Sequence, residues 1–233
     1  MKEEKKPILL EGDLGNAVAE AYRRRVQEEF PNHAVLTGLK WEGGTVRYAN
    51  TYSLVLLNQV LHDFGYQVAT LRDIEDAMDS QNSLVPQIFT YQTGIVLTRE
   101  PSKSARYLVR ELGSRIGVSY GQKLELPLMI SLQDLELIDD KRAMFGLTFY
   151  LPSYAKVIPA PEFNEKYHLH KFGDADRNGL PVLDSDGNRT LHLKPAKKTG
   201  LYKVEVPNKD ALFANDERLE HAQRNYCVAV VKK

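Results

Sequence analysis

Apolar side chains recur at helical spacing in the first half of the chain, most clearly between Asp13 and Phe30. One side of that segment is apolar and the other carries charges, including Arg23 to Arg25, which predicts an amphipathic helix. Pro31 follows directly and is expected to end the helix. The apolar side consists of Leu14, Val18, Ala21, Tyr22, Val26 and Phe30.

Capping signals and apolar spacing predict three further helices. Asn50 is a favourable N-cap, and Gly65 is a typical C-terminal stop for the helix that Asn50 begins. Thr70 and Asp73 have the spacing of a capping box. An amphipathic pattern that ends at Gly117 indicates the last helix. The three predicted helices cover residues 51–64, 71–78 and 105–116.

Strand-like segments, rich in β-branched and aromatic residues, dominate after about residue 120, where the helical spacing nearly vanishes. In the first half, residues 33–38 and 45–48 are expected to form a hairpin around Glu42 to Gly44. Polar residues at 139–142 predict a turn. The other predicted strands cover residues 7–11, 88–98, 124–132, 135–138, 146–151, 156–160, 190–193, 201–206 and 226–231.

This distribution favours an α+β fold, with helices mainly in the N-terminal half and a mixed or antiparallel sheet mainly in the C-terminal half. A three-layer α/β arrangement is the first alternative. We expect residues 1–233 to form a single compact unit, and any boundary between two lobes would lie near residues 118–122.

Composition and charge narrow the classes of function. The chain is 42% hydrophobic and 27% charged, which is typical of a globular protein. Lys and Arg together number 31, as do Asp and Glu, so a dedicated nucleic-acid binder is disfavoured. No apolar segment reaches the roughly 20 residues that span a bilayer, and no signal peptide is recognisable. A soluble, cytoplasmic protein is expected, in which Cys227 is a buried apolar residue.

An acidic stretch between residues 172 and 188 contains the pattern Asp-x-Asp-x-Asn twice, ten residues apart. The first copy, together with Gly179, resembles positions one, three, five and six of an EF-hand calcium loop, although Ser185 stands where that loop has its bidentate glutamate. These residues offer oxygen ligands for calcium, and they are also the commonest turn formers, so both interpretations are open. The candidate calcium ligands are Asp174, Asp176, Asn178, Asp184, Asp186 and Asn188.

Three histidines near this stretch offer a second metal hypothesis. His168 and His170 flank one residue of an expected strand, and His192 lies in a strand that could pair back across the acidic loop. With Asp174 they form a donor set suited to zinc, iron or manganese. The order His-x-His, carboxylate, His resembles the metal motif of cupins, which would imply a metal-dependent enzyme.

One more local resemblance concerns the fold. The segment from Gly65 to Glu75, which begins Gly-Tyr-Gln-Val-Ala-Thr, is similar to a Gly-Tyr-Arg-Leu-Pro-Thr segment of C-type-lectin-like folds related to formylglycine-generating enzymes. That resemblance implies a C-type-lectin-like fold as a further alternative to α+β.

No catalytic motif stands out from the sequence, so the leading hypothesis is a non-enzymatic protein that acts through binding or interaction. The chain has many tyrosines, Tyr150 and Tyr154 among them, which suit an interface or a ligand groove. The alternatives are a metal-dependent enzyme of the hydrolase type and a calcium-stapled domain. Many short strands have edges that need covering, and a homo-oligomer would be one way to cover them.

Overall fold

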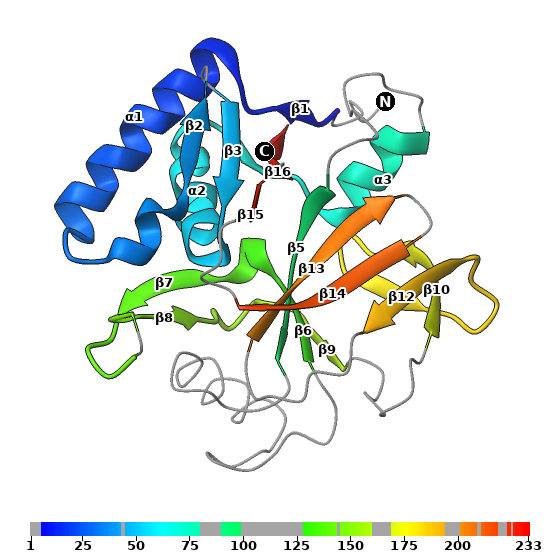
Figure 1. The fold of residues 1–233 in the computed structure, drawn as a ribbon. Helices are drawn as coiled ribbons and strands as arrows, with labels where there is room; N and C mark the ends of the chain where they lie inside the picture. The colour runs from blue at the N-terminus through cyan, green and yellow to red at the C-terminus, as the bar shows by residue number, and fades with distance from the viewer. Residues whose placement is uncertain are drawn as a thin grey trace.

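The computed structural model describes residues 6–42, 45–79, 90–98, 128–143, 145–159, 169–193, 201–208, 211–218, 223–224 and 226–233. Figure 1 shows the predicted α+β arrangement, with three helices in the N-terminal part of the described chain and antiparallel sheets mostly in the C-terminal half. The three-layer α/β alternative is therefore wrong. The predicted helix over residues 105–116, the suggested boundary near residues 118–122 and His168 lie outside the described residues.

The first two helices begin and end close to the predicted residues. Helix α1 covers Gly12–Glu29 and α2 covers Thr51–Asp63. At the start of α2 the Asn50 side chain accepts a hydrogen bond from the Ser53 amide, and the Ser53 hydroxyl accepts one from the Asn50 amide. This reciprocal cap satisfies two amides that the helix itself leaves without partners.

The predicted capping box of the third helix is also confirmed. Helix α3 covers Leu71–Asp79, and the Asp73 carboxylate accepts hydrogen bonds from both the amide and the hydroxyl of Thr70. The Asp73 amide in turn donates to the Thr70 hydroxyl at 3.2 Å. Local chemistry therefore fixes where this short helix starts.

The strand predicted over residues 33–38 is wrong, because Ala34–Gly38 forms the 3-10 helix η1. Its hydrogen bonds are local: the Leu36 amide donates to the His33 carbonyl, and the Thr37 hydroxyl donates to the Ala34 carbonyl. The predicted hairpin exists, but its first strand is β2, Lys40–Glu42, which pairs with β3, Thr45–Ala49.

Most of the remaining strands lie in the second half, as the sequence predicts, but the strands over residues 66–68, 181–183 and 211–218 are not among the predicted ones. The segment predicted as one strand over residues 124–132 ends at Ser131 in the structure, where the 3-10 helix η3, Leu132–Asp134, begins. The other strands are β1 Ile8–Leu9, β4 Tyr66–Val68, β5 Thr90–Thr98, β6 Leu128–Ser131, β7 Glu136–Asp139, β8 Leu147–Tyr150, β9 Val157–Pro159, β10 Leu169–Ala175, β11 Pro181–Leu183, β12 Arg189–Leu193, β13 Leu201–Asn208, β14 Ala211–Arg218, β15 Gln223–Arg224, β16 Tyr226–Cys227 and β17 Ala229–Lys232.

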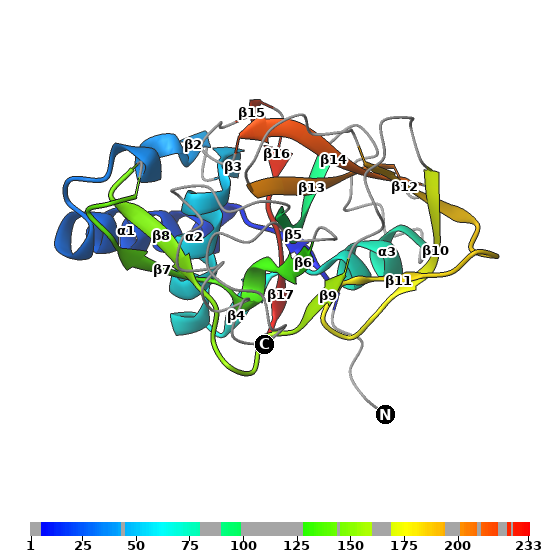
Figure 2. The same ribbon diagram turned by 90° about the horizontal axis from the view of Figure 1, so that it is seen from below.

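One large sheet runs in the order β11-β10-β12-β14-β13-β5-β6-β9, and β16 also pairs with β5. The pairings are antiparallel except β12 with β14 and β16 with β5. In Figure 2, α1, α2 and the β7–β8 hairpin lie at one end of the molecule and β10, β11 and β12 lie at the other. Strands β10 to β12, with the acidic turns between them, therefore form a part of the large sheet that lies away from α1 and α2.

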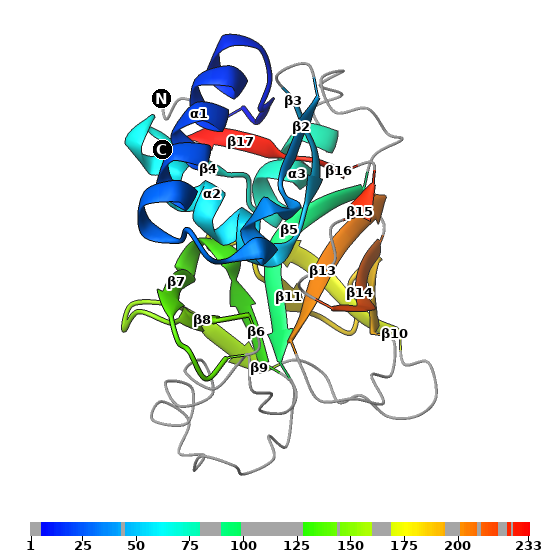
Figure 3. The same ribbon diagram turned by 60° about the vertical axis from the view of Figure 1, so that its left-hand side comes forward.

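A small sheet joins the two ends of the described chain. Strand β17 lies between β1 and β4, with Ile8 opposite Val230 and Val68 opposite Val230 on the other side. Figure 3 shows β17 and β4 beside α1 and α2. This sheet holds the N-terminal helices and the last strand together.

One buried apolar cluster draws on both halves of the chain. Leu54, Leu57 and Leu61 of α2 are fully buried in it, together with Leu147 and Phe149 of β8. The rings of Tyr52 and Phe149 stack with their centroids 4.7 Å apart, which joins α2 to the β7–β8 hairpin. That hairpin is therefore fixed against the helices. The expected single unit of residues 1–233 stays a prediction.

Candidate functional site

The first acidic motif forms a turn between β10 and β11. One carboxylate oxygen of Asp176 accepts hydrogen bonds from the amides of Asn178, at 2.8 Å, and Leu180, at 3.0 Å. Gly179 has a φ of 74°, and a Cβ built on it would lie 2.6 Å from the Cβ of Thr70. The turn therefore needs glycine both for its backbone conformation and for its close contact with the start of α3.

The other carboxylate oxygen of Asp176 is hydrogen-bonded to the ammonium group of Lys156, which directly precedes β9. Burial acts to raise the pKa of Asp176, but the hydrogen bonds from Lys156, Leu180 and Asn178 and the Lys156 charge together hold that pKa below its usual range. Because β9 and β11 are the two ends of the large sheet, this ion pair connects its opposite edges.

The second acidic motif forms another turn, between β11 and β12. The Asp184 carboxylate accepts a hydrogen bond from the Asp186 amide at 2.9 Å, and the Gly187 amide donates to the Asp184 carbonyl at 3.1 Å. A Cβ on Gly187 would lie 2.3 Å from the carbonyl oxygen of Phe172, so glycine is required there. Asn188 is exposed at the end of the turn.

Asp174 lies on β10 and has different partners from Asp176. Its carboxylate accepts a hydrogen bond from the Ala175 amide at 2.8 Å and lies 3.7 Å from Nη1 of Arg72. No three His, Cys, Asp or Glu side chains gather in a metal-binding arrangement among the residues that the structure describes. The hydrogen bonds of the two motifs are those of turns, and calcium binding by them stays a prediction.

The histidine hypothesis rests on residues that the structure describes only in part. The predicted pairing across the acidic loop exists, since β10 and β12 are antiparallel neighbours. In that register His192 lies opposite Leu169, and His170 lies opposite Leu191. His168 is outside the described residues. A site for zinc, iron or manganese made by these histidines and Asp174 stays a prediction.

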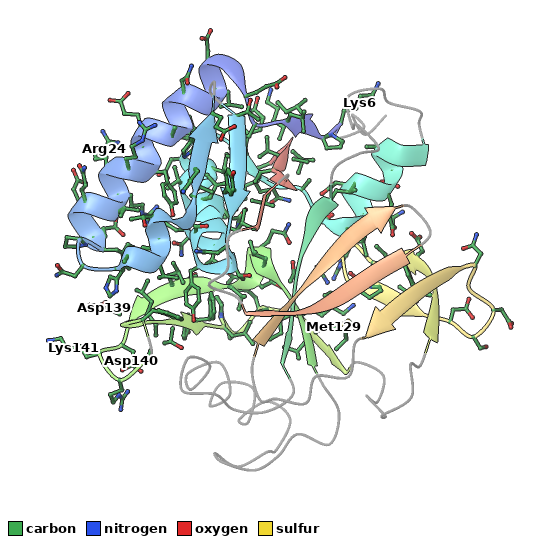
Figure 4. All side chains as sticks on the ribbon, in the orientation of Figure 1. Lys6, Arg24, Met129, Asp139, Asp140 and Lys141 are labelled. Atoms are coloured by element: carbon green, nitrogen blue, oxygen red, sulfur yellow. The ribbon has the colours of Figure 1, made fainter. Side chains whose placement is uncertain are left out.

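A histidine and an aspartate that the sequence did not connect meet at the other end of the molecule. His33 Nε2 lies 2.7 Å from the Asp139 carboxylate, and His33 Nδ1 lies 3.0 Å from the carbonyl oxygen of Phe145. Figure 4 shows Asp139 and Lys141 at the tip of the β7–β8 hairpin, near η1. Since 112 residues separate His33 from Phe145, no local pattern could have revealed the contact.

The contacts of this histidine hold the hairpin against η1. Both nitrogens of His33 face oxygen acceptors, and its side chain is only 12% exposed. The Asp139 carboxylate and the Phe145 carbonyl therefore fix the ring between η1 and the hairpin.

A third region, residues 151–156 between β8 and β9, presents a tyrosine to solvent; we call it the Tyr154 turn. Tyr154 is 74% exposed, while Leu151, Pro152 and Ala155 are buried. The Ala155 amide donates to the Pro152 carbonyl at 3.1 Å, which closes the turn. The tyrosine is thus carried outward by a segment that is itself packed and hydrogen-bonded.

Two carboxylates accompany this turn. The Asp134 side chain accepts a hydrogen bond from the Lys156 amide at 3.2 Å, and Glu136 lies opposite Tyr150 in the β7–β8 register. Partial burial raises the pKa of Tyr154, and the negative charges of Glu136 and Asp134, with Tyr150, raise it further. The phenol is therefore neutral at physiological pH and lies in a negative electrostatic environment.

No known protein family matches this chain, and no curated protein or solved structure is significantly similar to it. None of the described helices is long and apolar enough to cross a membrane.

Proposed function

We propose that this protein is a non-enzymatic binding protein that engages a partner through the Tyr154 turn. The observation that carries the proposal is the 74% exposure of Tyr154 on an anchored segment. Single exposed apolar side chains are common on protein surfaces, so exposure alone does not indicate a binding site. The proposal therefore depends on the surroundings of Tyr154.

The setting favours binding for two reasons. Tyrosine combines a large apolar ring with a hydroxyl and is enriched among the residues that dominate interface energies. The turn is held by the Pro152–Ala155 hydrogen bond and by the contacts of Lys156 with Asp134 and Asp176, so little conformational freedom remains to be lost on binding. A partner would meet a preformed aromatic contact.

A displayed library of random peptides tests this proposal. Wild-type protein selects peptides, and each is then measured against Tyr154→Ser and against Val182→Ser, which removes an apolar side chain that is 48% exposed elsewhere. Peptides that lose binding to Tyr154→Ser and keep binding to Val182→Ser are expected. If every selected peptide binds both variants alike, the Tyr154 turn is not the binding surface.

The metal-dependent hydrolase is kept as a second candidate because β10 pairs with β12, which brings the backbone at His170 and His192 into neighbouring strands. Elemental analysis of protein purified without affinity metal or chelator tests it. Stoichiometric zinc, iron or manganese, lost in His170→Ala, would support the enzyme. Metal-free protein whose melting temperature is unchanged by these ions would exclude it.

The calcium-stapled domain is tested in the same melts. A melting temperature that rises with calcium and falls with chelator, in wild type but not in Asp176→Asn, would support the staple.

We also propose a cytoplasmic location and, as one way of covering the edges of the short strands, a homo-oligomer. Light scattering would measure the oligomeric state.

A further inference from the structure

We propose that Asn178, in the first acidic turn, is a site of spontaneous deamidation that the folded chain suppresses and the unfolded chain exposes. Asn178 is followed directly by Gly179, and no other asparagine of the chain precedes a glycine. The modification replaces the side-chain amide with a carboxylate, and in part it reroutes the main chain through that side chain. It would therefore mark, irreversibly, each chain in which this turn has opened.

The reaction uses only groups of the chain and water. The Gly179 amide nitrogen loses its proton to hydroxide and attacks the side-chain carbonyl carbon of Asn178. A new C–N bond forms, the bond to the side-chain nitrogen breaks, and that nitrogen takes a proton from water and leaves as ammonia. Water then opens the resulting cyclic imide at either carbonyl, which gives aspartate or isoaspartate at position 178. Glycine has no Cβ beside the attacking nitrogen, so an asparagine before glycine is the least hindered.

The electrophilic side chain is not what restrains this reaction in the folded chain. Asn178 is partly exposed, and its carboxamide makes no hydrogen bond with any residue that the structure describes. The side chain can therefore turn its carbonyl carbon toward the main chain without losing a contact. Any protection of Asn178 has to come from the attacking nitrogen.

The attacking nitrogen is held by the turn. The Gly179 amide donates a hydrogen bond to the Asp176 carbonyl at 2.8 Å, and Gly179 is buried. Deprotonation would lose this bond and leave a negative nitrogen against the carbonyl oxygen, which is unfavourable away from water. The amides on either side, of Asn178 and Leu180, donate to the Asp176 carboxylate. The backbone before and after the nitrogen is therefore fixed, and the reaction requires the turn to open.

The products of the reaction do not fit the closed turn. The imide has no proton on the Gly179 nitrogen, so the hydrogen bond to the Asp176 carbonyl is lost. Isoaspartate adds one carbon to the main chain directly before Gly179, which lies close against α3. A Cβ built on Gly179 would lie 2.6 Å from the Cβ of Thr70 and 3.1 Å from the Leu71 amide nitrogen. A chain with isoaspartate at position 178 therefore closes this turn only if the start of α3 moves.

Peptide mapping by mass spectrometry tests the proposal. Wild type is incubated at mildly alkaline pH with and without enough urea to unfold it, and samples are digested with trypsin at successive times. Cleavage after Arg177 and Arg189 releases one peptide that contains both Asn178 and Asn188. Asn188 is the internal control for the effect of urea, because arginine and not glycine follows it. Fragmentation locates the modified residue, and chromatography separates aspartate from isoaspartate.

Two variants test whether the hydrogen bonds of the turn give the protection. Asp176→Ala removes the side-chain acceptor of the Asn178 and Leu180 amides and leaves the Asn-Gly pair unchanged. Asp184→Ala is the matched control, since it removes the corresponding acceptor from the second acidic turn. Circular dichroism before the incubation establishes that each variant is folded.

We expect Asn178 to deamidate at least about tenfold faster in unfolded than in folded wild type, because reaction in the folded chain requires local opening. Folded Asp176→Ala should react about tenfold faster than folded wild type, since two hydrogen bonds that hold the turn are lost. Asp184→Ala should change the rate less than about twofold, because its effect is confined to the other turn. Isoaspartate should accumulate only where the turn has opened.

Equal rates at Asn178 in folded and unfolded wild type would overturn the proposal, because the turn would then give no protection. An unfolded chain in which Asn178 reacts no faster than Asn188 would overturn it as well, because the site would not be reactive. Equal rates in folded wild type and folded Asp176→Ala would refute protection by the hydrogen bonds of the turn. The comparison within wild type decides the proposal by itself where Asp176→Ala does not fold.

Discussion

Replacing His33 with alanine would remove the contact that fastens η1 to the tip of the β7–β8 hairpin. The ring is hydrogen-bonded to the Phe145 carbonyl and to the Asp139 carboxylate, and it lies edge-to-face against Phe30 with centroids 6.0 Å apart. It also covers Gly146 so closely that a Cβ added there would lie 2.7 Å from the ring. All of these contacts are lost together in the alanine variant.

The expected magnitude follows from the exposure of each partner. Asp139 is 65% exposed and is rehydrated when the ring is removed, so its contact with the His33 ring contributes at most about 1 kcal/mol. The hydrogen bond to the Phe145 carbonyl is partly buried and contributes about 1 kcal/mol. Loss of ring packing against Phe30 adds about 0.5 to 1 kcal/mol. His33→Ala should therefore lower the free energy of unfolding by about 2 to 3 kcal/mol.

Urea unfolding followed by circular dichroism measures this change, and Asp139→Asn is the matched comparison. Asparagine keeps a neutral acceptor at the same place, so Asp139→Asn should cost less than about 1 kcal/mol. A loss below about 0.5 kcal/mol for His33→Ala would refute the view that this ring fastens the hairpin. Equal losses in both variants would show that the exposed contact with Asp139, and not the carbonyl contact and the ring packing, carries the energy.

Three further predictions concern single positions. Gly187→Ala should lower the free energy of unfolding in urea by more than about 2 kcal/mol, because the added Cβ would lie 2.3 Å from the Phe172 carbonyl and the backbone there would have to shift. A loss under about 0.5 kcal/mol, the size of an ordinary surface change, would contradict this. Thr51→Val should leave the melting temperature unchanged or raise it, because its buried hydroxyl has no hydrogen-bond partner among the described residues, and a clear fall would show that the hydroxyl is satisfied in solution. Asp176 has a lowered pKa in the folded state, so its contribution to stability is present above about pH 4 and is lost as the pH falls. The free energy of unfolding of Asp176→Asn should therefore fall less steeply with decreasing pH than that of wild type. Parallel curves of unfolding free energy against pH would refute the Lys156 ion pair.

The sequence predicted those features whose causes are local. The caps at Asn50 and Thr70 depend on side chains three residues away, so the starts of α2 and α3 could be read directly from the chain. The strand predicted over residues 33–38 is wrong because apolar residues at these positions fit a strand as well as a turn. What decides the conformation is tertiary: the Asn50 side-chain amide donates to the Val35 carbonyl at 2.7 Å, and Tyr22 donates to the Leu36 carbonyl at 2.8 Å.

The acidic stretch shows where residue chemistry alone stops being informative. Asp, Asn and Gly at these spacings are typical both of calcium loops and of tight turns. Backbone amides of the turns donate to Asp176 and Asp184. The cations that approach Asp174 and Asp176 are Arg72 and Lys156, which belong to other parts of the fold. Two of these partners are set by the packing of α3 and β9, which no pattern within residues 172–188 contains.

The Tyr154 turn depends on the same kind of distant determinant. In the sequence Tyr154 is one of 12 tyrosines, and nothing beside it distinguishes an exposed ring from a buried one. Its exposure arises because Leu151, Pro152 and Ala155 are buried and because Asp134, at the end of η3, holds the backbone of Lys156. The buried neighbours and the hydrogen bonds of Ala155 and Lys156 fix the backbone that carries the ring. In the proposed complex, the backbone of the turn would therefore be ordered before a partner binds, and only the side chain would remain to be ordered.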